Sequence, residues 1–389
     1  MHPSTIYNRR ALSYGAVPHA PWNGGAKRSV FKVGLTAREE IGPVTPFTHP
    51  EFDAHERVVF INDQASGLRA IIAIHSTRLG PAAGGCRMWP YASPDEALAD
   101  VLRLSRGMTY KNAVAGLDLG GGKAVIIADP KTQKTPALMR AFGRAVEGLG
   151  GAYFTAEDVG VGVDDMELVR QETRFVAGLA EGRHASGDPS PVTARGVFEG
   201  LRIAVRLKLG REDLTGVRVA VQGLGHVGES LCGMLGEAGA TLLVADIDPA
   251  RAQAVARASG AAVVAPDAII DADADVFAPC ALGGILNDDT IPRLRARIIA
   301  GAANNQLGRP EHGDALHARG ILYVPDFVIN GGGIINVARE IAGIDDGGWV
   351  EQKLAGLVAN LEAILREAAE RAVPPAGIAE DFARRRLAV

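Results

Sequence analysis

The stretch VRVAVQGLGHVG, residues 217–228, decides the fold of this chain. Its first half is the short apolar run of a buried β-strand, and its second half is a GxGxxG pattern that opens a helix. Gly223, Gly225 and Gly228 allow a tight turn, close approach of a pyrophosphate and close packing of helix on strand. The helix N-terminus also offers free N–H groups to an anion. The pattern predicts a Rossmann-type dinucleotide-binding domain.

The next predicted strand, residues 241–245, ends in Asp246. A carboxylate about twenty residues beyond the glycines accepts hydrogen bonds from ribose hydroxyls and repels a 2′-phosphate. Since no arginine follows Asp246 immediately, NAD is expected rather than NADP. A glycine-rich turn in a doubly wound sheet that binds no nucleotide is the alternative interpretation.

Upstream of this unit, the chain reads as a second α/β domain. Apolar runs at 58–62 and 68–74 flank a turn and predict a β-hairpin. Ser93 and Thr135, each followed by proline, are typical helix N-caps. Because 389 residues exceed one ordinary core of roughly 100–200 residues, we expect two domains with a boundary near residue 180.

The composition excludes several classes of protein. A formal net charge of −4 gives no electrostatic footprint for nucleic acid, and no apolar run reaches the roughly 18 residues of a membrane span. Cys86, Cys232 and Cys280 lack the spacing of a disulfide framework or a zinc site, so we expect no metal and a cytoplasmic location. Residues 1–45 are basic and lack an apolar h-region, which favours a disordered tail or a misplaced start over an organellar transit peptide.

Two lysines, Lys111 and Lys123, differ in setting from a solvated surface lysine. Lys123 lies between the glycine run 120–122, which we expect to be flexible, and an apolar strand, so partial burial would lower its pKa and make it a base. A phosphate-binding role is the alternative, but the Walker pattern fails because Leu117 replaces its first glycine and Ala124 its Ser or Thr.

Seven segments carry a resemblance that covers about residues 48–385. They are HSTRLGPAAGGCRMWPY, GMTYKNAVAGLDLGGGKAVI, YFTAEDVGVGVDDM, SPVTARGV, APCALGG, AGAANNQL and PDFVINGGGIINVARE, in this order along the chain. Together they resemble the glutamate/leucine/phenylalanine/valine dehydrogenase superfamily, most closely its leucine dehydrogenase branch.

The resemblance implies a domain order and a reaction. The expected segments are a tail at 1–45, a substrate-binding and oligomerisation domain at 46–180, a Rossmann NAD domain at 181–345, and a helical segment at 346–389 that packs back toward the substrate domain. The implied reaction is the NAD-dependent oxidative deamination of an L-amino acid to its 2-oxo acid and ammonia, and its reverse, by a homo-oligomer.

The resemblance also implies roles for single residues. The residue matching Lys111 binds the substrate α-carboxylate with Gly84 and Gly85, the one matching Lys123 activates water, and the one matching Asp158 moves protons. Thr193 and Asn304 match positions beside the nicotinamide, and Asn305 matches one beside the substrate. Without the resemblance, the pair Asn304-Asn305 reads equally well as a polar turn after a strand.

The implied specificity pocket is apolar and consists of Ala83, Ala156, Ile334 and Val337. A lysine at the position of Ala83 accompanies glutamate specificity, and its absence disfavours a charged substrate. We therefore expect leucine, valine or isoleucine as the substrate. A phenylalanine or other aromatic amino-acid dehydrogenase is the alternative because alanine at this position deepens the pocket, and an inactive or biosynthetic relative is a further one. Arg195 stands where the resemblance predicts tyrosine.

Overall fold

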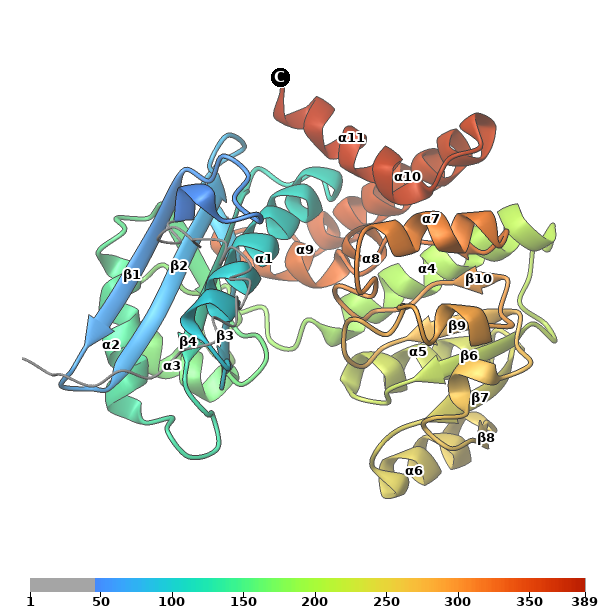
Figure 1. The fold of residues 1–389 in the computed structure, drawn as a ribbon. Helices are drawn as coiled ribbons and strands as arrows, with labels where there is room; N and C mark the ends of the chain where they lie inside the picture. The colour runs from blue at the N-terminus through green and yellow to red at the C-terminus, as the bar shows by residue number, and fades with distance from the viewer. Residues whose placement is uncertain (1–45, 389) are drawn as a thin grey trace, which may run out of the picture. The chain divides into compact units, whose positions relative to one another are not determined.

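The first sheet of the computed structural model, which describes residues 46–388, contains five strands in the order β1-β2-β4-β3-β5 (Figure 1). The predictions for residues 1–45 concern a part of the chain outside this range. A short 3₁₀ turn, η1 (Pro46–Thr48), precedes this sheet, whose strands are β1 (Arg57–Asp63), β2 (Leu68–Ser76), β3 (Ala82–Trp89), β4 (Gly120–Ile127) and β5 (Tyr153–Ala156). Strands β1 and β2 pair antiparallel from Arg57↔Ile74 to Asp63↔Leu68, which confirms the predicted hairpin.

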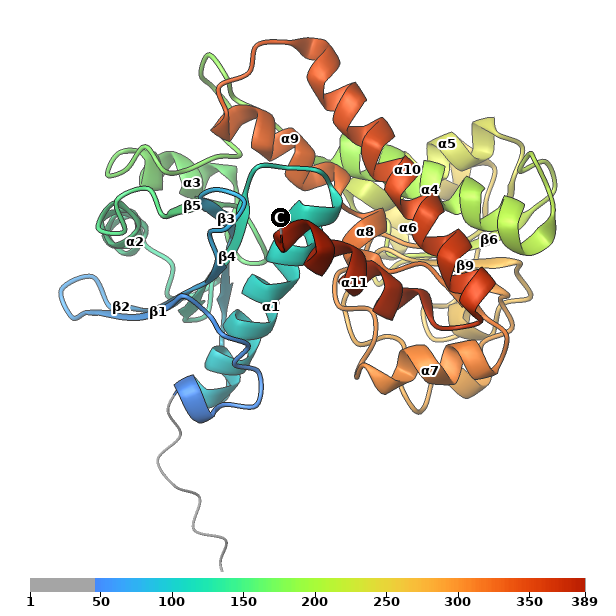
Figure 2. The same cartoon turned by 90° about the horizontal axis from the view of Figure 1, so that it is seen from above.

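Three helices cover the two faces of this sheet, α1 (Pro94–Val114), α2 (Pro136–Glu147) and α3 (Val163–Arg170). Helix α1 lies on one face, and α2 and α3 lie on the other (Figure 2). Apolar side chains of all three helices pack against the sheet. The predicted N-caps are confirmed. The Ser93 hydroxyl accepts from the Glu96 amide, and the Thr135 hydroxyl accepts from the Leu138 amide.

The glycine run before Lys123 was predicted to be flexible, and this prediction was wrong. Strand β4 begins at Gly120, and Lys123 is an internal strand residue. A Cβ on Gly121 would lie 2.1 Å from the Thr109 nitrogen of α1, and one on Gly122 would lie 2.7 Å from the Tyr153 ring. The glycines are needed because helix and neighbouring side chains press against the strand.

The second sheet contains six parallel strands in the order β11-β10-β9-β6-β7-β8. Its strands are β6 (Arg218–Gln222), β7 (Thr241–Ala245), β8 (Ala262–Val263), β9 (Val276–Pro279), β10 (Ile298–Ile299) and β11 (Leu322–Tyr323). One face packs against α4 (Ser190–Leu209), α5 (His226–Glu237) and α6 (Pro249–Ser259). The other packs against η2 (Ile269–Asp271), η3 (Ile291–Arg293) and α7 (Glu311–Ala318). This is the doubly wound arrangement that the glycine pattern predicted.

Four further helices end the chain, α8 (Asp326–Ile329), α9 (Gly332–Ile341), α10 (Gly347–Arg371) and α11 (Pro375–Leu387). Helix α11 returns to α1, where Arg386 donates to the Ala113 carbonyl at 2.8 Å. Arg195, whose consequence the sequence left open, forms a two-pronged ion pair from α4 to Glu351 of α10, with both N–O distances 2.6 Å. This pair ties two helices beside the second sheet.

Helix α9 holds the segment that joins the two sheets. The Glu340 carboxylate accepts from the amides of Gly178 and Ser186, at 2.8 and 3.1 Å, and from the Ser186 hydroxyl at 2.6 Å. Asn336 donates to the Ser186 carbonyl at 2.9 Å. Residues 178–186 are therefore bound to one face of α9.

Within residues 46–388 no helix is long and apolar enough to cross a membrane. The same residues contain no group of three or more His, Cys, Asp or Glu side chains that would hold a metal ion. All three cysteines are free thiols.

Candidate active site

A buried ion pair joins the two residues expected to carry the chemistry. The Lys123 ammonium, on β4, lies 2.6 Å from Asp158 Oδ2, just beyond the end of β5. Arg87 Nε, on β3, lies 3.2 Å from the same oxygen. Burial alone would raise the pKa of the Asp158 carboxyl, but the Lys123 and Arg87 cations hold it well below its usual range. The carboxylate is therefore ionised near neutral pH.

Lys111 projects from α1 toward residues that follow β10. Its ammonium donates to Asn304 Oδ1 at 3.1 Å, and Asn330 Nδ2 donates to the same oxygen at 2.7 Å. Burial lowers the pKa of Lys111 to about 8, although the nearby Asp326 carboxylate acts in the opposite direction. Lys111 is thus a cation near neutral pH, and the Asn304 carbonyl oxygen occupies part of its hydrogen-bonding capacity.

The two lysines share a small cavity of about 60 Å³ with residues from both halves of the described chain. Its lining is Arg87, Leu104, Gly107, Met108, Lys111, Lys123, Asn304, Asn305, Asp326 and Phe327. Asn305 has a left-handed backbone, with φ +51°, which asparagine tolerates better than most residues. Its carbonyl accepts from the Gly284 amide at 2.7 Å and so holds the loop after β9.

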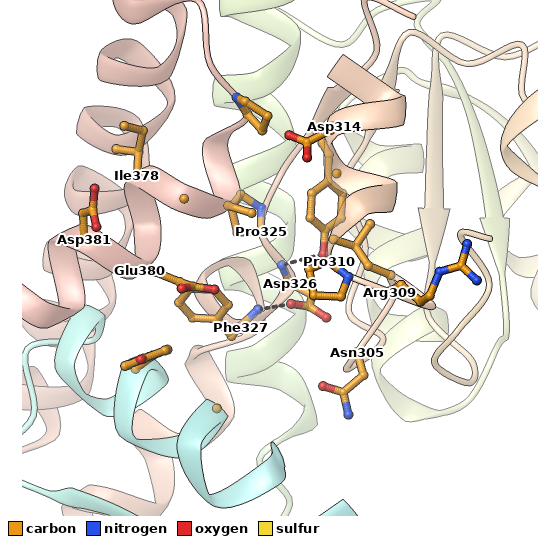
Figure 3. A pocket seen from close by; sticks show the side chains of 18 of the residues that line it. Asn305, Arg309, Pro310, Asp314, Pro325, Asp326, Phe327, Ile378, Glu380 and Asp381 are labelled. Atoms are coloured by element: carbon orange, nitrogen blue, oxygen red, sulfur yellow. Dashed lines mark hydrogen bonds between the residues drawn. The ribbon is translucent and has the colours of Figure 1, made fainter. Parts of the chain in front are cut away.

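A second cavity of about 650 Å³ adjoins the first and shares Asn305, Asp326 and Phe327 with it (Figure 3). The Asp326 carboxylate accepts from the Phe327 amide at 2.7 Å and from the Gln306 amide at 2.9 Å. Burial raises the pKa of this carboxyl above its ordinary value. Asp326 is therefore a titratable group next to Lys111 that the sequence did not single out.

The residues expected to bind the substrate side chain lie in two adjoining apolar clusters. Ala156 and Val337 pack with Ala177, and Ile334 packs against this cluster. Ala83 is buried in the larger neighbouring cluster, against which Ile334 also packs. None of these positions carries a charge, so nothing there would pair with a charged substrate side chain.

Gly84 and Gly85 lie in β3, where close packing requires glycine. A Cβ on Gly84 would lie 2.0 Å from the Gly122 carbonyl oxygen, and one on Gly85 would lie 2.3 Å from the Glu157 carbonyl oxygen. The Tyr153 hydroxyl, from the neighbouring strand β5, donates to the Gly84 carbonyl at 2.6 Å and so helps to hold β3 in place. A larger residue at Gly84 would displace β4, which carries Lys123, and one at Gly85 would displace the segment after β5 that carries Asp158.

The glycine loop after β6 has the features that a dinucleotide requires. Gly223 has φ +89°, and a Cβ on Gly228 would lie 2.1 Å from the Gly223 carbonyl oxygen. Nothing stands within 4 Å of the Cβ direction of Gly225, which is the N-cap of α5 and leaves the first amides of the helix without a side-chain cap. These residues therefore fit a pyrophosphate.

Asp246 follows β7 directly, and its side chain is only 5% exposed. It accepts from the amides of Leu224 at 2.7 Å and Asp248 at 2.8 Å, so it is fixed against the glycine loop. Arg251, on α6, lies 3.7 Å from Asp246 Oδ2. An arginine therefore stands beside Asp246 in the fold, although none follows it directly in the sequence.

Thr193 lies in the first turn of α4, where its hydroxyl donates to the Pro189 carbonyl at 2.9 Å. A Cβ on Gly333 would lie 2.8 Å from this hydroxyl oxygen, so the start of α9 approaches it closely. Thr193 therefore stands next to the helix that carries Ile334 and Val337.

Sequence reasoning missed Arg87, Asp326 and Asn330 as members of the site. The alternation of β3 was the available signal for Arg87, because it places this residue on the same face as Ala83 and Gly85. No comparable local pattern indicated Asp326 or Asn330, which reach the site only through the tertiary fold.

Comparison with known proteins agrees with this geometry. Residues 55–175 match the dimerisation domain of the Glu/Leu/Phe/Val dehydrogenases, and residues 245–376 match the Glutamate/Leucine/Phenylalanine/Valine dehydrogenase model. The chain belongs to this family. It is an oxidoreductase that acts on the CH–NH₂ group of amino acids, in a family that uses NAD or NADP.

Similar relatives carry different substrate names. Leucine dehydrogenase of Bacillus subtilis (strain 168) is 50% identical over 335 residues, covering 86% of this chain and 92% of that protein. Phenylalanine dehydrogenase of Bacillus thermotolerans is 50% identical over 316 residues, covering 80% and 82%. The crystal structure of L-tryptophan dehydrogenase from Nostoc punctiforme is 46% identical with a TM-score of 0.73, covering 86% and 96%. Overall similarity therefore does not select one amino acid.

Proposed function

We propose that this amino-acid dehydrogenase oxidises leucine, valine or isoleucine with NAD, releasing the 2-oxo acid and ammonium. The observation that carries the proposal is the uncharged cluster of Ala156, Ala177 and Val337, in which Ala156 stands two residues before Asp158 and Val337 comes from α9. Burial in this cluster would stabilise a bound apolar side chain. A carboxylate would lose its hydration there and find no partner of opposite charge.

In this proposal the lysines divide the work. The Lys111 ammonium binds the substrate carboxylate, aided by the strand at Gly84 and Gly85, and Asn305 contacts the substrate from the other side of the cavity. When bound, NAD would supply the acceptor for the hydride of the α-carbon. Lys123, once it has lost its own proton, removes a proton from the attacking water, and Asp158 takes protons from the amine and returns one to the leaving ammonia.

The same proposal assigns the coenzyme site. Gly223, Gly225 and Gly228 form the pyrophosphate cradle, while Thr193 and Asn304 orient the nicotinamide amide. Asp246 accepts from the ribose, and its charge disfavours a 2′-phosphate. Arg251 is already shared between Asp246 and Asp248, at 3.7 and 3.8 Å, which supports NAD over NADP.

The test is the rate of NADH formation with purified protein and single amino acids: leucine, valine, isoleucine, phenylalanine, tryptophan and glutamate, each with NAD and again with NADP. We expect the highest kcat/KM with a branched-chain substrate and NAD. An aromatic preference would favour the second candidate, which the small side chain of Ala83 supports. If no substrate gives NADH or NADPH, the assignment is refuted and a biosynthetic or inactive relative is favoured.

We also propose that the protein is a homo-oligomer assembled through its first domain. Two observations support this. The matching family model for residues 55–175 describes a dimerisation domain, and β1 is an edge strand whose Phe60 side chain is 57% exposed. Light scattering after gel filtration tests the proposal, and a monomer at micromolar concentration would refute it.

A further inference from the structure

Arg87 lies beside the proposed catalytic residues but has no role in the reaction proposed above. It lies on β3, two residues beyond Gly85 and on the same face, and it lines the 60 Å³ cavity of the two lysines. It also lines a neighbouring cavity of about 510 Å³ together with Tyr91 and Asp100. Arg87 therefore lines both cavities.

The guanidinium of Arg87 is fixed from two directions. Its Nη1 donates to Asp100 Oδ2 at 3.0 Å, and the Tyr91 hydroxyl donates to the same oxygen at 2.6 Å. Its Nε donates to Asp158 Oδ2 at 3.2 Å. The planar, permanently charged group is thus clamped between two carboxylates, which a flexible lysine ammonium would match poorly.

Asp158 belongs to a group of four charged side chains whose charges sum to zero. Lys123 and Arg87 are cations, and Asp158 and Asp100 are anions. Other titratable groups whose electrostatic interaction with Asp158 contributes are Lys111, Glu157, Tyr91, Tyr153 and Cys86. Because arginine does not lose its proton, Arg87 supplies a constant charge while Lys123 and substrate exchange protons nearby.

We propose that Arg87 is a positioning residue for proton transfer, anchored by Asp100 and Tyr91, that orients the Asp158 carboxylate against Lys123 and keeps it ionised. This inference rests on the proposed function, because it assigns Asp158 to proton transfer. It does not require Arg87 to contact the substrate or the coenzyme.

The test compares kcat and KM in wild type, Arg87→Met and Arg87→Lys. A positioned proton-transfer group contributes about 100- to 10,000-fold to the rate, so Arg87→Met should lower kcat at least about tenfold while the KM for the amino acid stays nearly constant. Arg87→Lys keeps the charge but not the planar clamp, so it should restore only part of kcat. Arg69→Met, which removes the same charge from an exposed position on β2, is the matched control and should keep the wild-type kcat.

The outcomes separate the inference from the proposed function. A silent wild type overturns both. An active wild type with an unchanged kcat in Arg87→Met, or with a change confined to KM, overturns the positioning role alone, whatever the loss in thermal stability. So does an equal loss of kcat in Arg69→Met, since the effect would then be one of net charge. Asp100→Asn provides a second variant: it removes the anchor but keeps the Arg87 charge, so it should lower kcat less than Arg87→Met does and leave KM nearly constant.

Discussion

The affinity for a 2-oxo acid should fall as pH rises through the pKa of Lys111. Burial lowers this pKa to about 8, and only the protonated amine attracts the substrate carboxylate. The protonated fraction is about 0.9 at pH 7, about 0.1 at pH 9 and about 0.01 at pH 10, so the dissociation constant should rise about tenfold per pH unit above 8. Each tenfold step corresponds to about 1.4 kcal/mol.

The assay is the titration of the NADH-bound enzyme with 4-methyl-2-oxopentanoate, with ammonia omitted so that no turnover occurs. An oxo acid is the right probe because it has no amine, and its carboxylate stays ionised over the whole range. The pKa of Lys111 in the enzyme–NADH complex is then obtained from the dependence of the dissociation constant on pH.

Lys111→Arg is the control, because a guanidinium keeps its proton throughout this range. Its absolute affinity should be lower, since the Asn304 contact at 3.1 Å fits an ammonium, but its affinity should be nearly constant between pH 7 and 10. An unchanged slope in Lys111→Arg would refute the reasoning and assign the titration to another group, of which Asp326 is the nearest candidate.

Three further variants test the remaining assignments. Lys123→Met should reduce kcat by about 100- to 10,000-fold while NAD affinity measured by calorimetry stays nearly constant, and near-normal turnover would remove this lysine from the mechanism. Asp246→Ala should weaken NAD binding by about tenfold and leave NADP binding unchanged or improved, since one charged hydrogen bond is lost; equal NAD affinity would mean that the ribose contact is misassigned. Ala83→Leu should raise the ratio of kcat/KM for leucine over phenylalanine by about tenfold, and a constant ratio would show that the side-chain pocket is formed elsewhere.

Local patterns were sufficient to predict several single elements of both sheets and their helices. The strand at 241–245 and the caps Ser93 and Thr135 depend on neighbours within a few residues, and the structure has all three as expected. The glycine run before Lys123 shows the limit of such patterns. Its residues were interpreted as a flexible loop, but their small size serves the approach of Thr109 and Tyr153, which are distant in sequence.

The candidate site was predicted only in part, for the same reason. Lys111, Lys123 and Asp158 were found through motifs, whereas Arg87 and Asn330 act on them through contacts that no sequence spacing encodes. Asn330 lies 26 residues from Asn304 along the chain, yet the two side chains are 2.7 Å apart. The position of Arg251 beside Asp246 likewise required the turn between β7 and α6 to be seen in three dimensions.

Helix α9 has a consequence for how such an enzyme diversifies. The same ten residues supply Val337 to the apolar cluster expected to receive the substrate side chain and Glu340 to the segment that joins the two sheets. A substitution that enlarges this cluster by shifting the helix also moves the attachment of that segment. Ala156 has the same limitation, because β5 pairs with residues 175–177 at the start of the connection. Substrate range should therefore change more freely through Ala83, on β3, than through α9.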